Sequence, residues 1–445
     1  MMFRSCRKVE ITRWTPIKLD YKTYRSPLNL SSASSLNFIQ RKFAEYYKEH
    51  RSEIQPPPAV EKREFGFLMF KEKMMIRHKS FKDMDEFASF VKRVTPSNVY
   101  YSSAYYEQPA AEMDEKGWLG ADLIFDIDAD HMPTPCGKIH DRWVCGNCGM
   151  AGKGPKPEKC PACGGQKFDE KTWPCEVCLS TTKEEARKLI DLLTEDFGLS
   201  PKEVRVFFSG HRGYHVQVES EQIRLLDSLA RREIVDYVLG LGLDAGFHGL
   251  EYTGTKRLQL QAGPSLSDPG WNGRIAKGTR AFLLNASRQE LEQIGLKKNT
   301  VNLILKSKDV LLKGWEKQGP WLAVKGIGVG SWRKIVEKAI ETQSSKIDTV
   351  VTTDVHRLIR LAGTLHGKTG LTKTEIPISD LEHFDPFRDA VAFKKGAVTV
   401  FVSEAPKFRV ENEVYGPIEN RKVELPTAAA LLLLCKGLAE TAGAK

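Results

Sequence analysis

Apolar and polar residues alternate between Asp122 and Asp128, which is the clearest pattern in the chain. Leu123, Phe125 and Ile127 fall on one face of an extended segment, and the acidic residues share the other face with one isoleucine. The pattern predicts a β-strand that is buried on one face and carries carboxylates at its end.

Two further strands are predicted at Val204–Phe208 and Tyr214–Val218. The segment Ser209–Gly213 between them contains two glycines, which let a backbone turn tightly and approach a ligand closely. Upstream, Glu64–Phe70 also has the composition of a strand.

Helices are predicted where the apolar period lengthens. One begins at Leu36 and ends before the proline run Pro56–Pro58, and Phe81–Val94 is amphipathic. Another is predicted to open at Thr182, with Glu185 completing a capping box.

These elements predict an α/β (α+β) protein with four parts. Residues 1–35, in which seven basic and two acidic residues leave a charge of +5, are predicted to be a basic flexible arm, with translation from an upstream start as the alternative. Residues 36–218 together with 347–445 form the α/β domain. A Cys/His-rich module occupies 136–178, and 219–346 is a mainly helical subdomain.

Composition narrows the class of protein. Hydrophobic residues make up 41% and charged residues 28% of the 445 residues, enough for a packed core. The net charge of +10 suits a polyanionic partner such as nucleic acid. The longest apolar run, Ala428–Cys435, is too short to span a membrane. The N-terminal residues lack the charged-then-apolar pattern of an export signal, so we expect a cytoplasmic protein.

Seven of the nine cysteines lie between Cys136 and Cys178. Closely spaced cysteine pairs in a cytosolic chain indicate metal ligands rather than disulfides. One set has zinc-ribbon spacing, with a glycine after each pair: Cys145, Cys148, Cys160 and Cys163. The flanking residues predict a second, outer zinc site in which the ribbon is an insertion: Cys136, His140, Cys175 and Cys178. A closed set of four ligands is typical of structural zinc.

Asp126 and Asp128 share one face of the predicted strand, with Cβ atoms roughly 6.5–7 Å apart. Two carboxylates so placed can hold divalent ions, and Mg²⁺ accepts one or two carboxylates while it keeps waters and substrate phosphates. The plainer interpretation is a pair of solvated acidic residues at a strand end.

Two clusters could bind phosphates. The turn contributes Ser209, Arg212 and His215, which suit the many acceptor oxygens of a triphosphate. The stretch Asp348–Lys368 adds four further donors: Arg357, Arg360, His366 and Lys368. In the same stretch, either Asp348 or Asp354 could complete a carboxylate triad with Asp126 and Asp128. Each cluster alone could be an ordinary hairpin or a basic surface.

In this order, the motifs resemble the catalytic small subunit of archaeal and eukaryotic DNA primase. The matching residues are Phe125–Asp130, the Cys/His module, Ser209–His215, and Arg357–Arg360 followed by Leu365–Gly370. The resemblance runs from about Leu36 to the C-terminus. It implies the primase small-subunit catalytic fold with a zinc-binding module and a helical subdomain.

The resemblance also implies roles for the matched positions. Asp126, Asp128 and Asp348 would hold two catalytic ions, Mg²⁺ or Mn²⁺, and Asp354 remains the competitor of Asp348. The residues implied to bind the incoming nucleoside triphosphate are Ser209, Arg212, His215, Arg360 and His366. The inserted ribbon is absent from shorter members of the family, and its role, as a contact for the template or for a partner, is left open.

The function predicted is primer synthesis on single-stranded DNA for replication, by two-metal nucleotidyl transfer, in a heterodimer with the primase large subunit and with two structural Zn²⁺ ions. A repair-type primase-polymerase shares these motifs and is the first alternative. A zinc-ribbon protein that only grips nucleic acid is the second. The sequence does not choose between ribonucleotides and deoxyribonucleotides.

Overall fold

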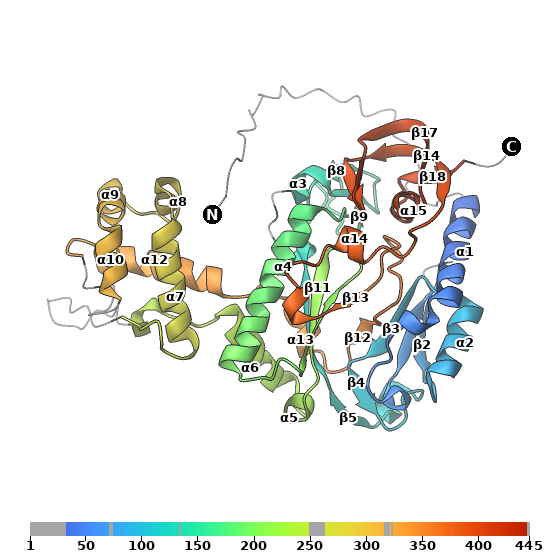
Figure 1. The fold of residues 1–445 in the computed structure, drawn as a ribbon, viewed down its shortest axis with the longest axis horizontal. Helices are drawn as coiled ribbons and strands as arrows, with labels where there is room; N and C mark the ends of the chain where they lie inside the picture. The colour runs from blue at the N-terminus through green and yellow to red at the C-terminus, as the bar shows by residue number, and fades with distance from the viewer. Residues whose placement is uncertain are drawn as a thin grey trace.

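A computed structural model describes residues 33–70, 74–132, 134, 136–248, 263–315, 321 and 324–442. Most of the predicted arm therefore lies outside the described residues. Helices and antiparallel sheets alternate along the chain (Figure 1), which confirms the mixed α/β class. The domain boundaries given above stay predictions.

The central sheet carries the strands predicted from alternation. Its strand order is β13-β10-β11-β6, and every neighbouring pair is antiparallel. The bounds are β6 Leu123–Asp128, β10 Val204–Phe208, β11 Gly213–Val218 and β13 Thr374–Ile376. Phe125 and Ile127 are fully buried, as the alternation requires. Helix α4 (Glu176–Asp191) packs against β11.

A second sheet of order β12-β3-β1-β2 lies beside the first, with helices α1 and α2 next to it (Figure 1). Phenylalanines join this sheet to α2, with the rings of Phe65 and Phe87 5.3 Å apart. The bounds are α1 Ala33–Glu49, α2 Met84–Val94, β1 Phe65–Leu68, β2 Met75–Lys79, β3 Asn98–Ser102 and β12 Leu358–Arg360. A short hairpin follows β3, formed by β4 (Ala104–Tyr106) and β5 (Trp118–Ala121).

The predicted start of helix α4 was wrong. The helix begins at Glu176, where the Cys175 sulfur accepts the backbone N–H of Cys178 at 3.4 Å. Thr182 lies inside the helix and its hydroxyl donates to the carbonyl of Cys178, so it caps nothing. The cap is the thiol of Cys175 in the outer cluster, whereas the usual sequence signal for a helix start is a Ser, Thr, Asp or Asn side chain.

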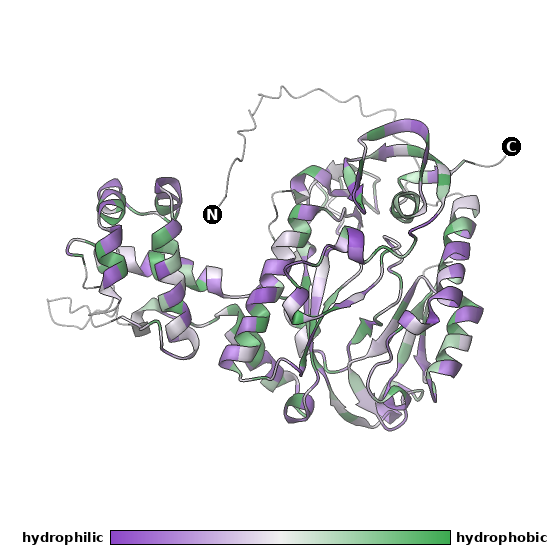
Figure 2. Ribbon diagram, in the orientation of Figure 1, coloured by the Kyte–Doolittle hydropathy of each residue, from purple (hydrophilic) through white to green (hydrophobic). Residues whose placement is uncertain are grey.

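A set of helices has a separate hydrophobic core around Ile275, Trp332 and Val336. Figure 1 shows it to one side of the sheets, and Figure 2 shows hydrophobic and hydrophilic residues side by side on its helices, as expected for helices with one buried face. The bounds are α7 Gly270–Asn285, α8 Arg288–Gln293, α9 Lys298–Lys306, α10 Lys308–Gly314 and α12 Val329–Gln343. The preceding helices α5 (Glu221–Arg224) and α6 (Ser228–Leu239) lie nearer the sheets, and Val235 of α6 belongs to the main core.

The Cys/His module is small: helix α3 and a three-stranded sheet of order β8-β7-β9. The C-terminal part adds a second three-stranded sheet, β17-β14-β18, packed on the apolar helix α15. Within the described residues, no helix combines the length and apolar character needed to cross a bilayer. The remaining bounds are α3 Gly137–His140, β7 Arg142–Cys145, β8 Ala151–Lys153, β9 Phe168–Lys171, α13 Thr349–Thr353, α14 Pro386–Asp389, β14 Ala397–Ala405, β15 Phe408–Val410, β16 Glu413–Tyr415, β17 Ile418–Pro426, α15 Thr427–Cys435 and β18 Ala439–Thr441.

Candidate active site and metal centres

The end of β6 brings Asp126 and Asp128 beside β11. Asp126 pairs in register with His215, whose Nε2 lies 3.6 Å from the Asp126 carboxylate. Asp128 pairs with Gly213, and a Cβ at that glycine would lie 2.1 Å from the carbonyl oxygen of Ile127. Glycine is therefore required for the turn to approach the carboxylate strand this closely.

Asp348 reaches the same strand from the far end of the sequence. Its backbone N–H donates to the Asp126 carbonyl oxygen at 2.8 Å, and its side chain caps α13 by accepting the N–H of Val350. Asp354 lies at the other end of this short helix, where its carboxylate accepts the N–H of His356. Of the two alternatives for a third carboxylate, Asp348 is the one hydrogen-bonded to β6.

A pocket of about 170 Å³ lies over these strands. Six of the predicted site residues line it: Asp126, Asp128, Ser209, His215, Arg360 and His366. Neither Asp348 nor Arg212 is among its lining residues. Three further polar residues line the pocket, namely Tyr100, His211 and Arg357. Arg357 is one of the phosphate donors predicted in the stretch Asp348–Lys368. His211 lies inside the Ser209–Gly213 turn, which was the available signal for it, and Tyr100 is placed by its pairing with Arg360 across β3 and β12.

The pocket histidines are neutral donors and acceptors. Burial, reinforced by nearby lysines and arginines, lowers the pKa of His211, His215 and His366 well below the ordinary histidine value. The rings of His211 and His366 stack at 5.0 Å. The backbone N–H of Lys368 donates to Nδ1 of His366 at 3.0 Å, which leaves Nε2 to carry the proton.

Arg360 supplies fixed positive charge on β12. One guanidinium nitrogen donates to the Asn98 side chain, and the guanidinium lies 5.1 Å from the centre of the Tyr100 ring. The buried Lys373 donates to the Arg360 carbonyl at 2.7 Å. Burial first, and then Arg360, lower the pKa of Lys373 well below its usual value. A phosphate group bound here would relieve the repulsion between these cations.

Seven of the described cysteines and His140 form two compact groups. In each group the donor atoms lie within 4.8 Å of one another: Cys136, His140, Cys175 and Cys178 in the outer group, and Cys145, Cys148, Cys160 and Cys163 in the ribbon. Zinc–thiolate bonds of about 2.3 Å place the sulfurs of a tetrahedral site less than about 4 Å apart. The closest sulfur contacts are 3.2 Å in the outer group and 3.6 Å in the ribbon. Donor number, type and spacing thus fit zinc in both.

Comparison with known proteins gives a consistent result. The family model described as DNA primase small subunit matches residues 165–378. The DNA primase small subunit PriS of Nitrosopumilus maritimus is 32% identical over 409 residues, covering 92% of this chain and 99% of that protein. Those of Methanothrix thermoacetophila and Archaeoglobus fulgidus are each 34% identical, covering 91% and 90% of this chain and 98% and 97% of theirs.

The chain belongs to the DNA primase small subunit family. This confirms the resemblance given by the ordered motifs, and with it the predicted role of a primase subunit in replication. The span matched by the family model includes the Ser209–Gly213 turn, Asp348 and the Arg360–His366 stretch.

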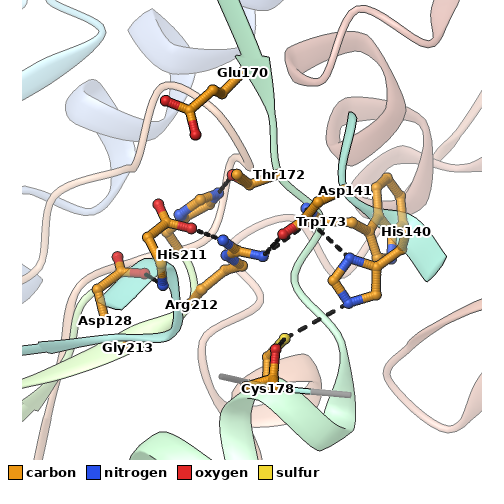
Figure 3. Close-up of polar contacts among 12 residues, drawn as sticks. Asp128, His140, Asp141, Glu170, Thr172, Trp173, Cys178, His211, Arg212 and Gly213 are labelled. Carbon is orange, nitrogen blue, oxygen red and sulfur yellow. Dashed lines mark hydrogen bonds and ion pairs between the residues drawn. The ribbon is translucent and has the colours of Figure 1, made fainter. Parts of the chain in front are cut away.

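Arg212 is placed differently from the other residues expected to bind nucleotide. Its side chain is 1% exposed and is ion-paired with Asp141 at 2.8 Å (Figure 3). It is also ion-paired with Asp130. Both guanidinium Nη atoms are therefore occupied by carboxylates of this primase subunit. Nothing in the sequence indicated these ion pairs, because Asp141 lies 71 positions away.

Proposed function

We propose that this primase subunit joins nucleotides into short primers on a single-stranded DNA template. The observation that carries the proposal is one pocket lined by both acidic and cationic groups. Asp126 and Asp128 line it together with Ser209, Arg360 and His366, which supply phosphate donors. A nucleoside triphosphate and divalent ions are the ligands that such a combination of groups suits.

Asp126, Asp128 and Asp348 are the residues that would hold the catalytic ions, Mg²⁺ or Mn²⁺. When bound, such ions neutralise charge on the reacting phosphate and activate the attacking hydroxyl. The carboxylate oxygens are hard donors of the type these ions prefer. Strand β6 fixes the positions of Asp126 and Asp128, and the backbone hydrogen bond from Asp348 to Asp126 holds Asp348 beside them.

Arg360 and His366 would hold the phosphate chain of the nucleotide, and Ser209 would add a hydroxyl. Neutral His366 donates through Nε2 without adding charge, whereas Arg360 offsets the charge of the departing pyrophosphate. Attack of a hydroxyl on the α-phosphate forms the new P–O bond, the bond to the pyrophosphate oxygen breaks, and the hydroxyl proton is released to water. The partners of this reaction are a DNA template, nucleoside triphosphates and the primase large subunit.

Primer synthesis by the Asp126→Asn variant tests this proposal. The protein, its large subunit, template, nucleotides and Mn²⁺ are combined, and labelled product is resolved by length. We expect a loss of about 10³-fold or more, since metal ions contribute several kcal/mol to such reactions.

The matched control is Asp309→Asn, the same chemical change at an exposed position of α10. It should synthesise primers at the wild-type rate. Undiminished synthesis by Asp126→Asn would reject the metal assignment, and DNA binding without synthesis by the wild-type complex would favour a purely binding role.

A further inference from the structure

Arg212 connects three segments that are distant in sequence. It lies in the turn between β10 and β11, and Nη1 donates to both Asp141 oxygens at 3.0 and 2.8 Å (Figure 3). Nη2 pairs with Asp130, and the Arg212 carbonyl accepts the N–H of Ala129 at 3.4 Å. Both the side chain and the backbone of Arg212 thus hold the segment that directly follows the Asp126–Asp128 strand.

Asp141 is the link from Arg212 to the outer metal group. Its Oδ1 is 2.7 Å from His140 Nδ1 and accepts the backbone N–H of Trp173 at 3.1 Å. Because a carboxylate only accepts here, the proton lies on Nδ1 of His140, and Nε2 is left with its lone pair. That Nε2 is 3.6 Å from the Cys178 sulfur and so faces the outer group (Figure 3).

Asp130 closes the chain of contacts on the active-site side. Its backbone N–H donates to Asp128 Oδ1 at 2.9 Å. The path therefore runs from His140 through Asp141 and Arg212 to Asp130 and on to Asp128. Each step is a direct hydrogen bond or ion pair, and the arginine in the middle is buried.

The consequence follows from the cost of an unpaired buried charge. Removing one partner of a buried ion pair leaves the other uncompensated, so Asp141 and Arg212 each stabilise the position of the other. If the outer ion leaves, His140 is released, and Asp141 loses a hydrogen-bond partner that fixed its orientation. The turn has no room to adapt, because Gly213 already lies against the carbonyl of Ile127.

We propose that Asp141 and Arg212 are positioning residues that couple the outer zinc site to the carboxylate strand. Zinc fixes the position of His140, and the hydrogen bond from His140 fixes Asp141. Asp141 in turn fixes the Arg212 side chain, which holds the turn and the strand end in place. The inference rests on the proposed function only for the role of Asp128. Because coupling is reciprocal, Arg212 also strengthens zinc binding, although it contacts no ligand atom of the zinc site.

The first test measures zinc retention against increasing concentrations of a chelator in the full-length protein, with no template or nucleotide present. We expect Asp141→Asn to lower the affinity for one of the two zinc ions by about 10–100-fold. Arg212→Gln should lower the affinity for the same ion, and the double variant should lower it no further than Asp141→Asn alone. The ribbon zinc should be unchanged in all three variants.

The control is Glu404→Gln, which removes the carboxylate partner of Arg142, an exposed arginine of the same module. It should retain both ions as the wild type does. If Arg212→Gln holds both ions with wild-type affinity, the coupling is wrong. Loss of both ions from Arg212→Gln would also overturn it, because that outcome is general unfolding of the module.

The second test follows hydrogen exchange of residues 204–218 and 123–130 in two ligand variants. Cys178→Ser, in the outer group, should speed exchange in both segments, and Cys148→Ser, in the ribbon, should not. Exchange in α1 and α2, whose Ile39 and Phe87 belong to the same main core as these strands, reports whether the domain is still folded. Unchanged exchange at 204–218 in folded Cys178→Ser contradicts the proposal. If that variant unfolds, zinc retention by Arg212→Gln decides. Neither readout involves primer synthesis, so failure here is distinct from failure of the proposed function.

Discussion

Arg63 and Asp122 form a fully buried ion pair at the start of the carboxylate strand. The guanidinium Nη2 lies 2.6 Å from the Asp122 carboxylate, and Nη1 donates to the carbonyls of Ser102 and Ser103. Tyr105 donates its hydroxyl to the second Asp122 oxygen at 2.9 Å. These contacts satisfy both charges and tie the central sheet to its neighbour.

Breaking this pair should destabilise the fold strongly. Arg63→Met leaves the Asp122 charge buried without its partner, and we expect the free energy of unfolding to fall by about 3–5 kcal/mol. Urea denaturation measures the change. The exposed pair Arg142–Glu404 provides the comparison, and Glu404→Gln should cost less than about 1 kcal/mol. Equal effects in the two variants would contradict this account.

The buried pocket histidines predict a pH dependence of stability. Burial keeps the pKa of His211 and His366 well below the value of about 6.5 expected in the unfolded chain. Below pH 6.5 the unfolded state therefore binds more protons than the folded state, and stability falls as the pH is lowered. The slope is about 1.4 kcal/mol per pH unit for each such proton.

Unfolding of the free subunit by urea at pH 6.5, 6.0 and 5.5 measures that slope. In His366→Gln the slope should be smaller by about one proton, because the glutamine does not titrate. An unchanged slope in this variant would show that His366 is protonated equally in the folded and unfolded states.

At the scale of the elements, the turn between β10 and β11 depends on Gly213. In Gly213→Ala the new methyl group would meet the carbonyl of Ile127, so β6 and β11 must separate. We expect a loss of primer synthesis of at least about 10²-fold, since an active-site displacement near 1 Å has that effect. Gly330→Ala in α12 provides the comparison, because no atom lies within 4 Å of the position that its new methyl group would take and its backbone is helical. Full activity in Gly213→Ala would refute the close-approach argument.

The sequence predicted those elements whose pattern arises locally. Alternation found β6, and runs of strand-forming residues on either side of a glycine-containing turn found β10 and β11, because each has a continuous buried face. Strand β17 was missed, since most of its residues are exposed and no alternation is visible. The start of α4 was misplaced because its cap is a thiol of the outer cysteine cluster.

The site was predictable to a similar extent and for a similar reason. Asp126, Ser209 and His366 lie in local motifs and all line the pocket. Arg212 has the same local setting, yet its buried guanidinium is ion-paired with two carboxylates that are distant in sequence. A residue's type and its neighbours in sequence indicate what it can bind, whereas the partner it finds depends on the tertiary fold.

At the scale of the whole molecule, the active site joins parts from across the chain. Helix α13, which brings Asp348 to β6, follows directly after the helical unit that ends with α12. The third carboxylate therefore depends on how the chain returns to the central sheet.

The most direct test of the central claim is a count of bound Mn²⁺ ions by electron paramagnetic resonance, with a non-hydrolysable nucleoside triphosphate present. The wild type should bind two ions per chain at the active site, and so should Asp354→Asn. Asp348→Asn and Asp126→Asn should each lose at least one. Two ions bound with wild-type affinity in Asp348→Asn, and a loss in Asp354→Asn, would contradict the assignment of the three carboxylates.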